Sequence, residues 1–359
     1  MRRPLFWGSA LGAGWILGGY PAALALAPAR PWRRGDVTPV VSIVVPAFNE
    51  HGTLEAKLRA LSELDYPPDR VEVVVAVDED RALADAAAAA LPSARVTFEP
   101  ARLGKAAALR RALGLVAGEV VILTDANNVL ASGSVRAAVA HFADPAVVAV
   151  AGRRGEVASA YDRYEDLLRR LETRSGSVAA MSGEFMAVRR DRLPPFPAGI
   201  VNDDLWLLCQ LVRGGGRVVY ERDAASEEAP LGTAAELARR SRIGAGRAML
   251  VRELHGLPPG FAVKLLSHKF GRLALPFLLL AAFGSSVSLA RRPRYRALAG
   301  LQAAAYGAGG LHAAGLAPGG PLGVPFRVAG QFVVGNVAVA VGVIRAARGR
   351  QRVTWTPVR

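Results

Sequence analysis

The chain has 359 residues, 52% of them hydrophobic, and a formal net charge of +15 at pH 7. All 30 acidic residues lie between Asp36 and Glu253, whereas 18 of the 45 basic residues lie outside that stretch, beside apolar segments. This distribution is typical of membrane flanks, so it excludes nucleic acid as the expected partner. The single cysteine, Cys209, excludes an intramolecular disulfide.

The N-terminal segment is apolar: residues 4–29 contain no charge and no histidine, and they are long enough to cross a bilayer. We predict a transmembrane helix over residues 1–29 and a basic linker over residues 30–39. A cleaved signal peptide is the alternative, because Arg2 and Arg3 precede the apolar run. The run is longer than the ~7–15 residues of a signal core, which favours the transmembrane helix.

Residues 40–257 are predicted to form one α/β domain, because β-branched runs alternate with alanine-rich helical stretches. This pattern predicts a mostly parallel, doubly wound sheet, whose ligand lies at the carboxyl ends of its strands. The expected strands are 41–45, 71–77, 95–98 and 120–124, and the expected helices between them are 53–64, 81–91 and 105–117.

The second half of this domain has a more mixed pattern. We expect helices over residues 160–174 and 203–213, and a short strand pair near residues 178–188. Thr233 and Glu236 form a capping-box pattern that opens a further helix ending near Glu253.

An interfacial amphipathic helix is expected over residues 258–272, followed by membrane segments over residues 273–345 and a basic tail over 346–359. The membrane region contains three apolar stretches, which are 273–290, 297–316 and 328–344. If the first stretch crosses, the arginines at 291–296 lie outside, against the positive-inside rule. We therefore expect the first stretch to dip into the bilayer and the next two to cross.

Polar residues follow the first two predicted strands. The first strand ends in the sequence Pro-Ala-Phe-Asn-Glu at residues 46–50, and the second ends at Asp78. Each is an ordinary strand-to-turn transition when taken alone, and the acidic turn at 78–80 can equally be a solvated loop.

The sequence Thr-Asp-Ala-Asn-Asn at residues 124–128 follows the strand 120–124. Asp125 at a strand end can bind Mg²⁺ or Mn²⁺, which prefer oxygen ligands and neutralise a diphosphate leaving group. The alternative is a simple Asx-type entry into the next element. Gly104 and Lys105 do not form a phosphate loop, because Glu99 and Ala106 stand where that motif requires glycine and Ser or Thr.

Asp203 and Asp204 open an apolar helix. Acidic residues stabilise a helix N-terminus in any protein, so capping is the structural explanation. A carboxylate held there also stays ionised and can act as general base toward an acceptor hydroxyl. Arg239, Arg240 and Arg242 suit diphosphate recognition, or contact with lipid headgroups.

The order of these motifs resembles the family 2 glycosyltransferases, especially the membrane branch that contains cellulose, hyaluronan and poly-N-acetylglucosamine synthases. The resemblance extends over the whole chain and includes Ser-Gly-Glu-Phe-Met at 182–186, Ser-His-Lys-Phe-Gly-Arg at 267–272 and Trp-Thr-Pro-Val-Arg at 355–359. It implies a GT-A fold and an inverting transfer from a nucleotide-sugar, with UDP-sugars expected, to a membrane-associated glycan or lipid acceptor.

The resemblance also assigns residues. It places the nucleotide-sugar against a group of residues at the strand ends, which are Pro46, Ala47, Asn49, Glu50, Asp78, Lys105, Asp125 and Asn127. Asp125 would bind the Mg²⁺ or Mn²⁺ ion, Asp204 would be the base with Asp203 as second choice, and Gly183 would border the acceptor. The domain would face the cytoplasm at a plasma or bacterial inner membrane.

Three features depart from the family pattern. Glu79 and Asp80 stand where Gly and Ser are usual, and Arg110 replaces a common Asn. Processive members carry a Gln-x-x-Arg-Trp-type motif after the base, and residues 239–243 do not match it. Two other functions remain open, a non-catalytic nucleotide-binding membrane protein and a nucleotidyltransferase.

Overall fold

The computed structural model describes residues 2–155, 157, 159–200, 202–228 and 233–349. Its described residues form two compact units. The sheet unit comprises Ala27–Leu231 and Arg252–Ala262, and the helical unit comprises Met1–Leu26, Gly232–Val251 and Val263–Gln351. The motif Trp-Thr-Pro-Val-Arg at 355–359 and most of the predicted tail lie outside the described residues.

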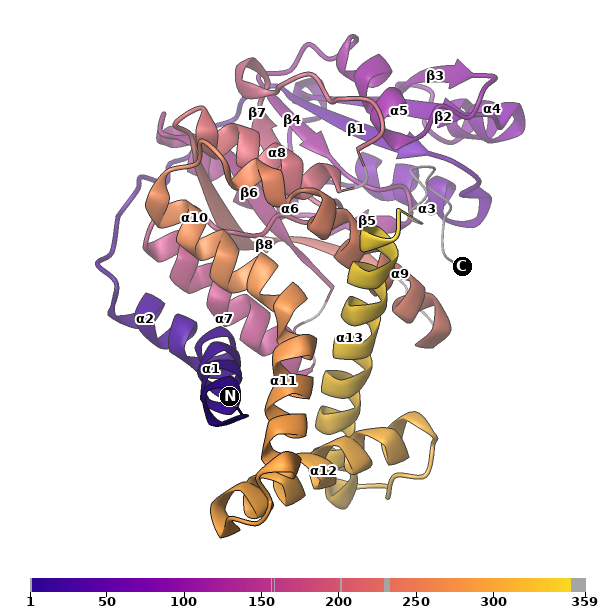
Figure 1. Ribbon diagram of the computed structural model, residues 1–359. Helices are drawn as coiled ribbons and strands as arrows, with labels where there is room; N and C mark the ends of the chain where they lie inside the picture. Colours follow the sequence, from indigo (N-terminus) through magenta and orange to yellow (C-terminus); the bar gives the residue numbers. More distant parts are fainter. Residues whose placement is uncertain (1, 156, 158, 201, 229–232, 350–359) are drawn as a thin grey trace. The chain divides into compact units, whose positions relative to one another are not determined.

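The sheet unit contains eight strands in one mixed sheet, in the order β3-β2-β1-β4-β7-β6-β8-β5 (Figure 1). The pairs β1·β2, β2·β3, β1·β4 and β6·β8 are parallel and the other three are antiparallel. The strands are β1 Val41–Ala47, β2 Val71–Asp78, β3 Arg95–Glu99, β4 Val120–Leu123, β5 Asn128–Leu130, β6 Val147–Arg154, β7 Met186–Arg189 and β8 Arg217–Glu228.

Helices connect and cover these strands. They are α3 His51–Ser62, α4 Arg81–Ala90, α5 Lys105–Leu113, α6 Ser134–Val139, α7 Ala160–Arg174 and α8 Asp203–Arg213. Strand β1 is buried along its whole length, and alternate residues from Val41 to Ala47 pack in one core cluster with Leu54 and Leu58 of α3. Each fully buried aliphatic side chain stabilises the fold by ~1.5–3 kcal/mol. This core fixes the register in which Val41 pairs with Val71 and Ala47 with Val77.

The expected mostly parallel α/β fold is confirmed, but several elements differ from the sequence prediction. Strands β5, β6 and β8 were not anticipated, because β6 is an alanine- and valine-rich run that reads equally as a buried helix. The strand pair expected near 178–188 is β7 alone, preceded by an isolated bridge between Ser182 and Phe185. Helix α5 ends at Leu113 rather than Ala117, because Gly114 follows it.

The helical unit contains α1 Arg2–Gly14, α2 Tyr20–Leu26, α9 Thr233–Met249, α11 Gly271–Ser288, α12 Pro293–Ala313 and α13 Val324–Ala347. Helix α10, Pro259–Leu265, crosses the boundary between the units and continues through a π-helical segment into α11. Helix α9 falls within the predicted domain of residues 40–257, and it packs against α13 in the helical unit.

Three helical segments are long and apolar enough to cross a membrane, namely Arg2–Leu26, Pro259–Ser288 and Pro321–Ala347. The first and third agree with predicted spans. The expected interfacial helix and the first C-terminal stretch form one 30-residue segment. The middle stretch, in α12, is not among the three, since Gln302, Tyr306, His312 and several glycines lower its hydropathy.

Candidate active site

The predicted residues of the sheet unit lie mostly at one edge of the sheet, because β1, β2 and β4 are parallel and end there. Pro46 and Ala47 are the last residues of β1, and Asp78 is the last residue of β2. Asp125 comes two residues after β4, and Lys105 is the first residue of α5. The sheet topology thus gathers side chains that are far apart in the sequence.

The backbone at this edge has unusual conformations. Asn49 has φ = 56° and Glu79 has φ = 65°, and both are non-glycine residues in the left-handed region. Gly104, with φ = 86°, directly precedes α5. Such conformations cost energy and are found preferentially at functional sites. The turns after β1 and β2 are therefore candidates for a functional role.

Three charged side chains meet at this edge. The Lys105 Nζ lies 2.8 Å from Asp125 Oδ1 and 2.9 Å from Asp203 Oδ2. The three side chains are mostly buried, with exposures of 18% for Lys105, 26% for Asp125 and 14% for Asp203. The start of α5, the end of β4 and the start of α8 therefore bring Lys105, Asp125 and Asp203 together. We call these three residues the Lys105 cluster.

The two carboxylates of the Lys105 cluster favour the protonated form of the lysine. Burial lowers the pKa of Lys105, but Asp125 and Asp203 outweigh burial through their charges and hydrogen bonds, and the pKa rises above its ordinary value. The lysine is therefore protonated at any physiological pH. Two carboxylates around one cation leave the cluster with a net charge of −1 (one Lys, two Asp).

Gly183 borders the Lys105 cluster from the segment before β7. A Cβ at this position would lie 3.3 Å from Asp125 Oδ2 and 3.3 Å from Lys105 Nζ. That spacing is tighter than ordinary contact, so a side chain here would displace the charged groups. Gly183, which was predicted to border the acceptor, therefore lies beside Asp125 and Lys105.

Asp203 and Asp204 have different surroundings at the start of α8. Asp203 belongs to the Lys105 cluster. The Oδ1 of Asp204 accepts hydrogen bonds from the Nδ2 of Asn202 and, at 2.7 Å, from the backbone N of Leu205. The two adjacent carboxylates are therefore held for different tasks, as expected from their position on a helix.

Asp78 is 2% exposed, and its carboxylate has partners within the chain. The Oδ2 accepts a hydrogen bond from the backbone N of Gly104 at 2.9 Å, and the Oδ1 pairs with Arg111 Nη2 at 3.0 Å. Asp78 therefore fixes the start of α5 and, through it, the position of Lys105.

A buried polar network underlies Asp125. The Nζ of Lys57, which is 0% exposed, donates to Thr124 Oγ1 at 2.6 Å and to Asn128 Oδ1. Thr124 and Asn128 both donate to the carbonyl oxygen of Glu184, at 2.7 and 3.0 Å. The turn that carries Asp125 is thus tied to the segment that carries Gly183.

A second part of this network reaches Asn127. Its Nδ2 donates to Glu228 Oε1 at 2.7 Å, and Arg154 pairs with Glu228 at 2.5 Å and with Glu184 at 2.9 Å. Sequence reasoning missed Lys57, Arg154, Glu184 and Glu228. Lys57 lies at a core-facing helical position between Leu54 and Leu58, and a lysine there was the one available signal.

The electrostatic effects of burial are large in this network. Burial lowers the pKa of Lys57 to about 7, although the charges of Asp125 and Glu184 oppose the shift. Burial raises the pKa of the Glu184 carboxyl, with the nearby Arg154 acting in the opposite direction. Burial therefore disfavours the charged forms of both Lys57 and Glu184, which lie next to the Lys105 cluster.

The residues present fit a divalent metal ion in a shared site rather than in an all-protein cage. No group of three or more His, Cys, Asp or Glu side chains with metal-binding geometry occurs among the residues that the structure describes. Mg²⁺ commonly uses one or two carboxylates and takes its remaining ligands from water and substrate phosphates. Asp125 and Asp203 provide oxygen donors, and the ammonium of Lys105 contacts both of them.

The predicted arginines Arg239, Arg240 and Arg242 lie on α9, which belongs to the helical unit. There α9 packs closely on α13, because Arg345 Nη1 lies 3.5 Å from Ser241 Oγ and Gly342 faces the backbone of Ser241. These arginines therefore belong to a different unit from the Lys105 cluster.

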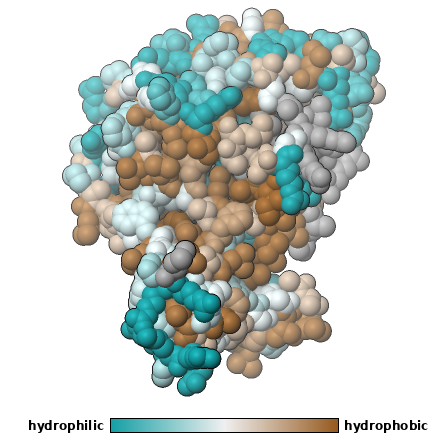
Figure 2. All heavy atoms as spheres, viewed as in Figure 1, coloured by the Kyte–Doolittle hydropathy of each residue, from teal (hydrophilic) through white to brown (hydrophobic). Residues whose placement is uncertain are grey.

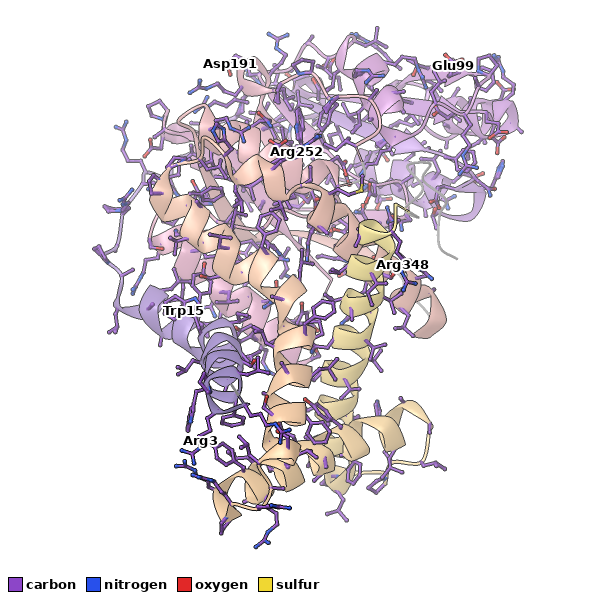
Figure 3. All side chains as sticks on the ribbon, viewed as in Figure 1. Arg3, Trp15, Glu99, Asp191, Arg252 and Arg348 are labelled. Carbon is purple, nitrogen blue, oxygen red and sulfur yellow. The ribbon has the colours of Figure 1, made fainter. Side chains whose placement is uncertain are left out.

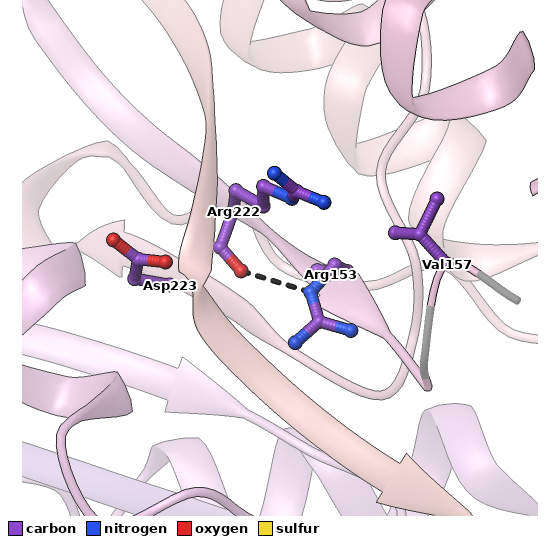
Figure 4. A pocket seen from close by; sticks show the side chains of 4 residues that line it. All are labelled: Arg153, Val157, Arg222 and Asp223. Atoms are coloured by element: carbon purple, nitrogen blue, oxygen red, sulfur yellow. Dashed lines mark hydrogen bonds between the residues drawn. The ribbon is translucent and has the colours of Figure 1, made fainter. Parts of the chain in front are cut away.

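A cavity of about 410 Å³ lies elsewhere in the sheet unit, lined by Arg153, Val157, Arg222 and Asp223 (Figure 4). The Nε of Arg153 donates to the carbonyl oxygen of Arg222 at 3.1 Å. None of the predicted site residues lines this cavity, so the candidate active site rests on the Lys105 cluster.

These features define a GT-A-like α/β domain with a carboxylate site at the carboxyl edge of its sheet. A family model described as "Glycosyltransferase like family 2" matches residues 39–249, more than half of the chain. The chain therefore belongs to the family 2 glycosyltransferases. The sequence-based identification of the family and of the enzyme class is confirmed.

A solved structure of similar length agrees in fold. A mannosyltransferase from Pyrobaculum calidifontis, in complex with GDP-Man and Mn²⁺, has a TM-score of 0.78 and 24% identity, covering 98% of this chain and 100% of that one. The glucosyl-3-phosphoglycerate synthase of Mycobacterium tuberculosis, with Mg²⁺ and UDP, has a TM-score of 0.45 and 21% identity, covering 64% and 88%. A comparison with curated proteins found no match.

Proposed function

We propose that this glycosyltransferase moves a sugar from a nucleotide-sugar, with inversion, to a membrane-associated glycan or lipid acceptor. The observation that carries this proposal is the Lys105 cluster at the carboxyl edge of the sheet, where doubly wound folds bind their ligands. Buried charges of both signs in a fixed arrangement stabilise developing charge without reorganisation. A displacement at a sugar carbon that expels a diphosphate needs such a site.

In this reaction an acceptor hydroxyl attacks the anomeric carbon, the bond from that carbon to the phosphate oxygen breaks, and the nucleoside diphosphate leaves. We assign the general base to Asp204, which takes the hydroxyl proton. Asp203 is the second choice, and its ion pair with Lys105 supports a positioning role. Gly183 leaves space for the acceptor beside Asp125.

Asp125 would hold Mg²⁺ or Mn²⁺, with Asp203 as the nearest further oxygen donor. When bound, the ion neutralises the diphosphate of the donor. Lys105 is a protonated donor at the same point and would contact the phosphate oxygens. Pro46, Ala47, Asn49, Glu50, Asp78 and Asn127 are assigned to the nucleotide side of the site.

The donor base is an open part of the proposal. The family resemblance points to UDP-sugars, whereas the structurally similar Pyrobaculum enzyme was solved with GDP-Man. The deciding experiment incubates the purified full chain in lipid nanodiscs with UDP- and GDP-sugars and measures nucleotide release, with Mn²⁺ and with excess chelator. Metal-dependent release from one donor class supports the proposal. Release that persists in excess chelator contradicts the metal assignment.

The membrane role rests on the three candidate spans and on the basic residues that flank them. We place the sheet unit on the cytosolic side, because nucleotide-sugars are made there. Cleavage of the sheet unit by protease added to intact cells would contradict this orientation.

A further inference from the structure

Six arginines gather at one end of the helical unit. Arg2 and Arg3 start α1, while Arg291, Arg292, Arg294 and Arg296 surround the junction between α11 and α12. All six side chains are exposed. Figure 3 labels Arg3 at this end of α1, and Figure 2 shows hydrophilic surface there beside the hydrophobic surface of the helices. We call these six residues the arginine end.

Aromatic packing joins the two segments of the arginine end. The rings of Phe6 and Tyr295 meet edge to face with centroids 5.1 Å apart, and Tyr295 is fully buried. The guanidinium of Arg294 lies 4.9 Å from the centre of the Tyr295 ring. Two segments almost 290 residues apart in the sequence (Phe6 and Tyr295) are thus fixed side by side with their arginines pointing to solvent.

Residues later in the segment α1–α2 contact residues earlier in the segment α10–α11. A Cβ at Gly12 would contact Leu278, and a Cβ at Gly271 would contact Ile16. Farther along, Trp15 Nε1 donates to Ser267 Oγ at 3.0 Å, and the rings of Tyr20 and His268 are 6.5 Å apart. The two segments are therefore antiparallel.

Two of the chain connections to the sheet unit lie at one end of this antiparallel pair of segments. Leu26 and Val263, where the chain passes to and from the sheet unit, both lie at the end opposite the arginines. Helix α11 alone has 18 residues, about 27 Å at ~1.5 Å per residue, close to the ~30 Å of a hydrocarbon core. The arginine end is therefore separated by about the thickness of a hydrocarbon core from the end of these helices where the chain continues into the sheet unit.

These arginines have almost no carboxylates to pair with in their own unit. The segments Met1–Leu26, Gly232–Val251 and Val263–Gln351 contain one acidic residue, Glu236, which lies in α9. Helix α9 packs against α13 near Gly342, far along that helix from its junction with α12. Neutralising charge for the arginine end must therefore come from outside this unit.

We propose that the arginine end is a binding surface for anionic phospholipid headgroups in the leaflet opposite the catalytic part. This inference rests on the proposed membrane insertion. Arginine matches phosphate oxygens through its planar, multidentate donor set, and basic residues beside apolar helices are attracted to anionic leaflets. The proposal requires the 30-residue segment Pro259–Ser288 to cross the membrane, and so it replaces the expectation that residues 273–290 only dip into the bilayer. The arginines then lie against the usual charge asymmetry of membrane proteins, and anionic headgroups compensate for them.

The first test uses the full chain reconstituted in phosphatidylcholine vesicles and probed with spin-labelled phosphatidylglycerol and spin-labelled phosphatidylcholine. We expect the motionally restricted lipid to be enriched in phosphatidylglycerol by about threefold or more, and salt to reduce the enrichment. Replacing Arg291, Arg292, Arg294 and Arg296 by Gln should bring the ratio close to one. Equal ratios in the native chain, or an unchanged ratio in this variant, overturn the proposal.

A matched control removes the same charge from the sheet unit by replacing the exposed Arg59, Arg190, Arg192 and Arg252 with Gln, and it should keep the native lipid preference. If neither spin-labelled lipid shows a restricted component, membrane insertion itself fails. If both lipids are restricted equally, only the arginine end fails as a lipid site.

The second test locates the leaflet in a Cys209→Ser background, with Arg296→Cys and Arg59→Cys made separately. An impermeant maleimide added to sealed cells should label position 296, and position 59 only after permeabilisation. Labelling of both positions from the same side overturns the assignment to the opposite leaflet.

Discussion

The two units of the molecule use their basic residues in different ways. In the sheet unit, Lys105, Arg111 and Arg154 each contact at least one carboxylate and are at least half buried. In the helical unit, the arginines of the arginine end are exposed, and the sequence offers them almost no acidic neighbours. Basic side chains therefore pair with carboxylates in one unit and are exposed in the other.

This difference shows that net charge alone says little about function in this chain. Charges inside the sheet unit act over short distances in a low dielectric, where removing one partner leaves the other uncompensated. Charges at the helix ends act on solvent or lipid and are screened by salt. Substitutions in the sheet unit should therefore have larger effects on chemistry than comparable substitutions in the helical unit.

The largest effect is expected at Asp204. If Asp204 is the general base, Asp204→Asn should lower turnover by ~10²–10⁴-fold, or roughly 3–5 kcal/mol of barrier. Donor binding should hardly change, because the amide keeps the size of the side chain and its Oδ1 can still accept the hydrogen bonds from Asn202 Nδ2 and Leu205 N. Asp203→Asn is the matched control. Normal turnover in Asp204→Asn with collapse in Asp203→Asn would move the base to Asp203.

The second prediction concerns the buried Lys57 and the pH dependence of stability. Its pKa is about 7 in the folded chain and 10.5 when exposed, so the unfolded chain binds more protons between these values. Burial of the charged form destabilises the fold fully below pH 7, and this penalty is relieved as the pH rises toward 10.5. Between pH 7 and 9 the native chain should gain up to ~2–3 kcal/mol.

Denaturant unfolding at several pH values measures this effect, with Lys57→Met as the comparison. The variant has no lysine to titrate there, so its stability should lack this rise. Removing Lys57 also leaves Thr124 and Asn128 without their buried partner, at a cost of ~1–3 kcal/mol per unsatisfied group. Identical pH profiles for the two proteins would contradict the assigned pKa.

The third prediction tests close packing in the helical unit. A Cβ at Gly342 on α13 would overlap the carbonyl oxygen of Ser241 on α9, whereas a Cβ at Gly307 on α12 would meet no atom within 4 Å. Gly342→Ala should cost ~1–3 kcal/mol, as overpacking usually does. Gly307→Ala should be neutral or stabilising. Thermal unfolding in detergent compares the two, and equal midpoints would show that α9 and α13 are not in tight contact.

The first half of the sheet unit could be predicted from the sequence because its signals are local. Strands β1 to β4 are short β-branched runs separated by helices, and the rule that ligands bind at strand ends led to Asp78, Lys105 and Asp125. The second half could not be predicted equally well. Strands β6 and β8 join through a long connection, and the alanine- and valine-rich sequence of β6 does not distinguish strand from helix.

The candidate site shows the same limit. Asp125, Lys105 and Asp203 are visible in the sequence as separate motifs, but their convergence on one nitrogen depends on how α5 and α8 are placed. Lys57 and Glu228 gave no motif, because their importance arises from partners 67 and 101 residues away. The packing of α9 against α13 is likewise a tertiary contact that the composition of α9 does not predict.

The smallest effect is expected at Gly183, and it separates crowding from loss of charge. Gly183→Ala places a methyl group 3.3 Å from both Asp125 Oδ2 and Lys105 Nζ, and it removes no charged or hydrogen-bonding side chain. Both atoms belong to side chains that can shift by a few tenths of an ångström, so the fold should tolerate the change. Misplacement of reacting groups by such amounts still slows a reaction, and we expect turnover to fall about tenfold. Gly133→Ala, where a Cβ meets no atom within 4 Å, serves as the control and should keep native turnover.

Steady-state kinetics of Gly183→Ala with varied Mn²⁺ and acceptor concentrations decide why turnover falls. A raised requirement for Mn²⁺ would mean that Asp125 has moved, and a raised KM for the acceptor alone would mean that Gly183 borders the acceptor, as proposed. Unchanged kinetics in Gly183→Ala would remove this glycine from the site.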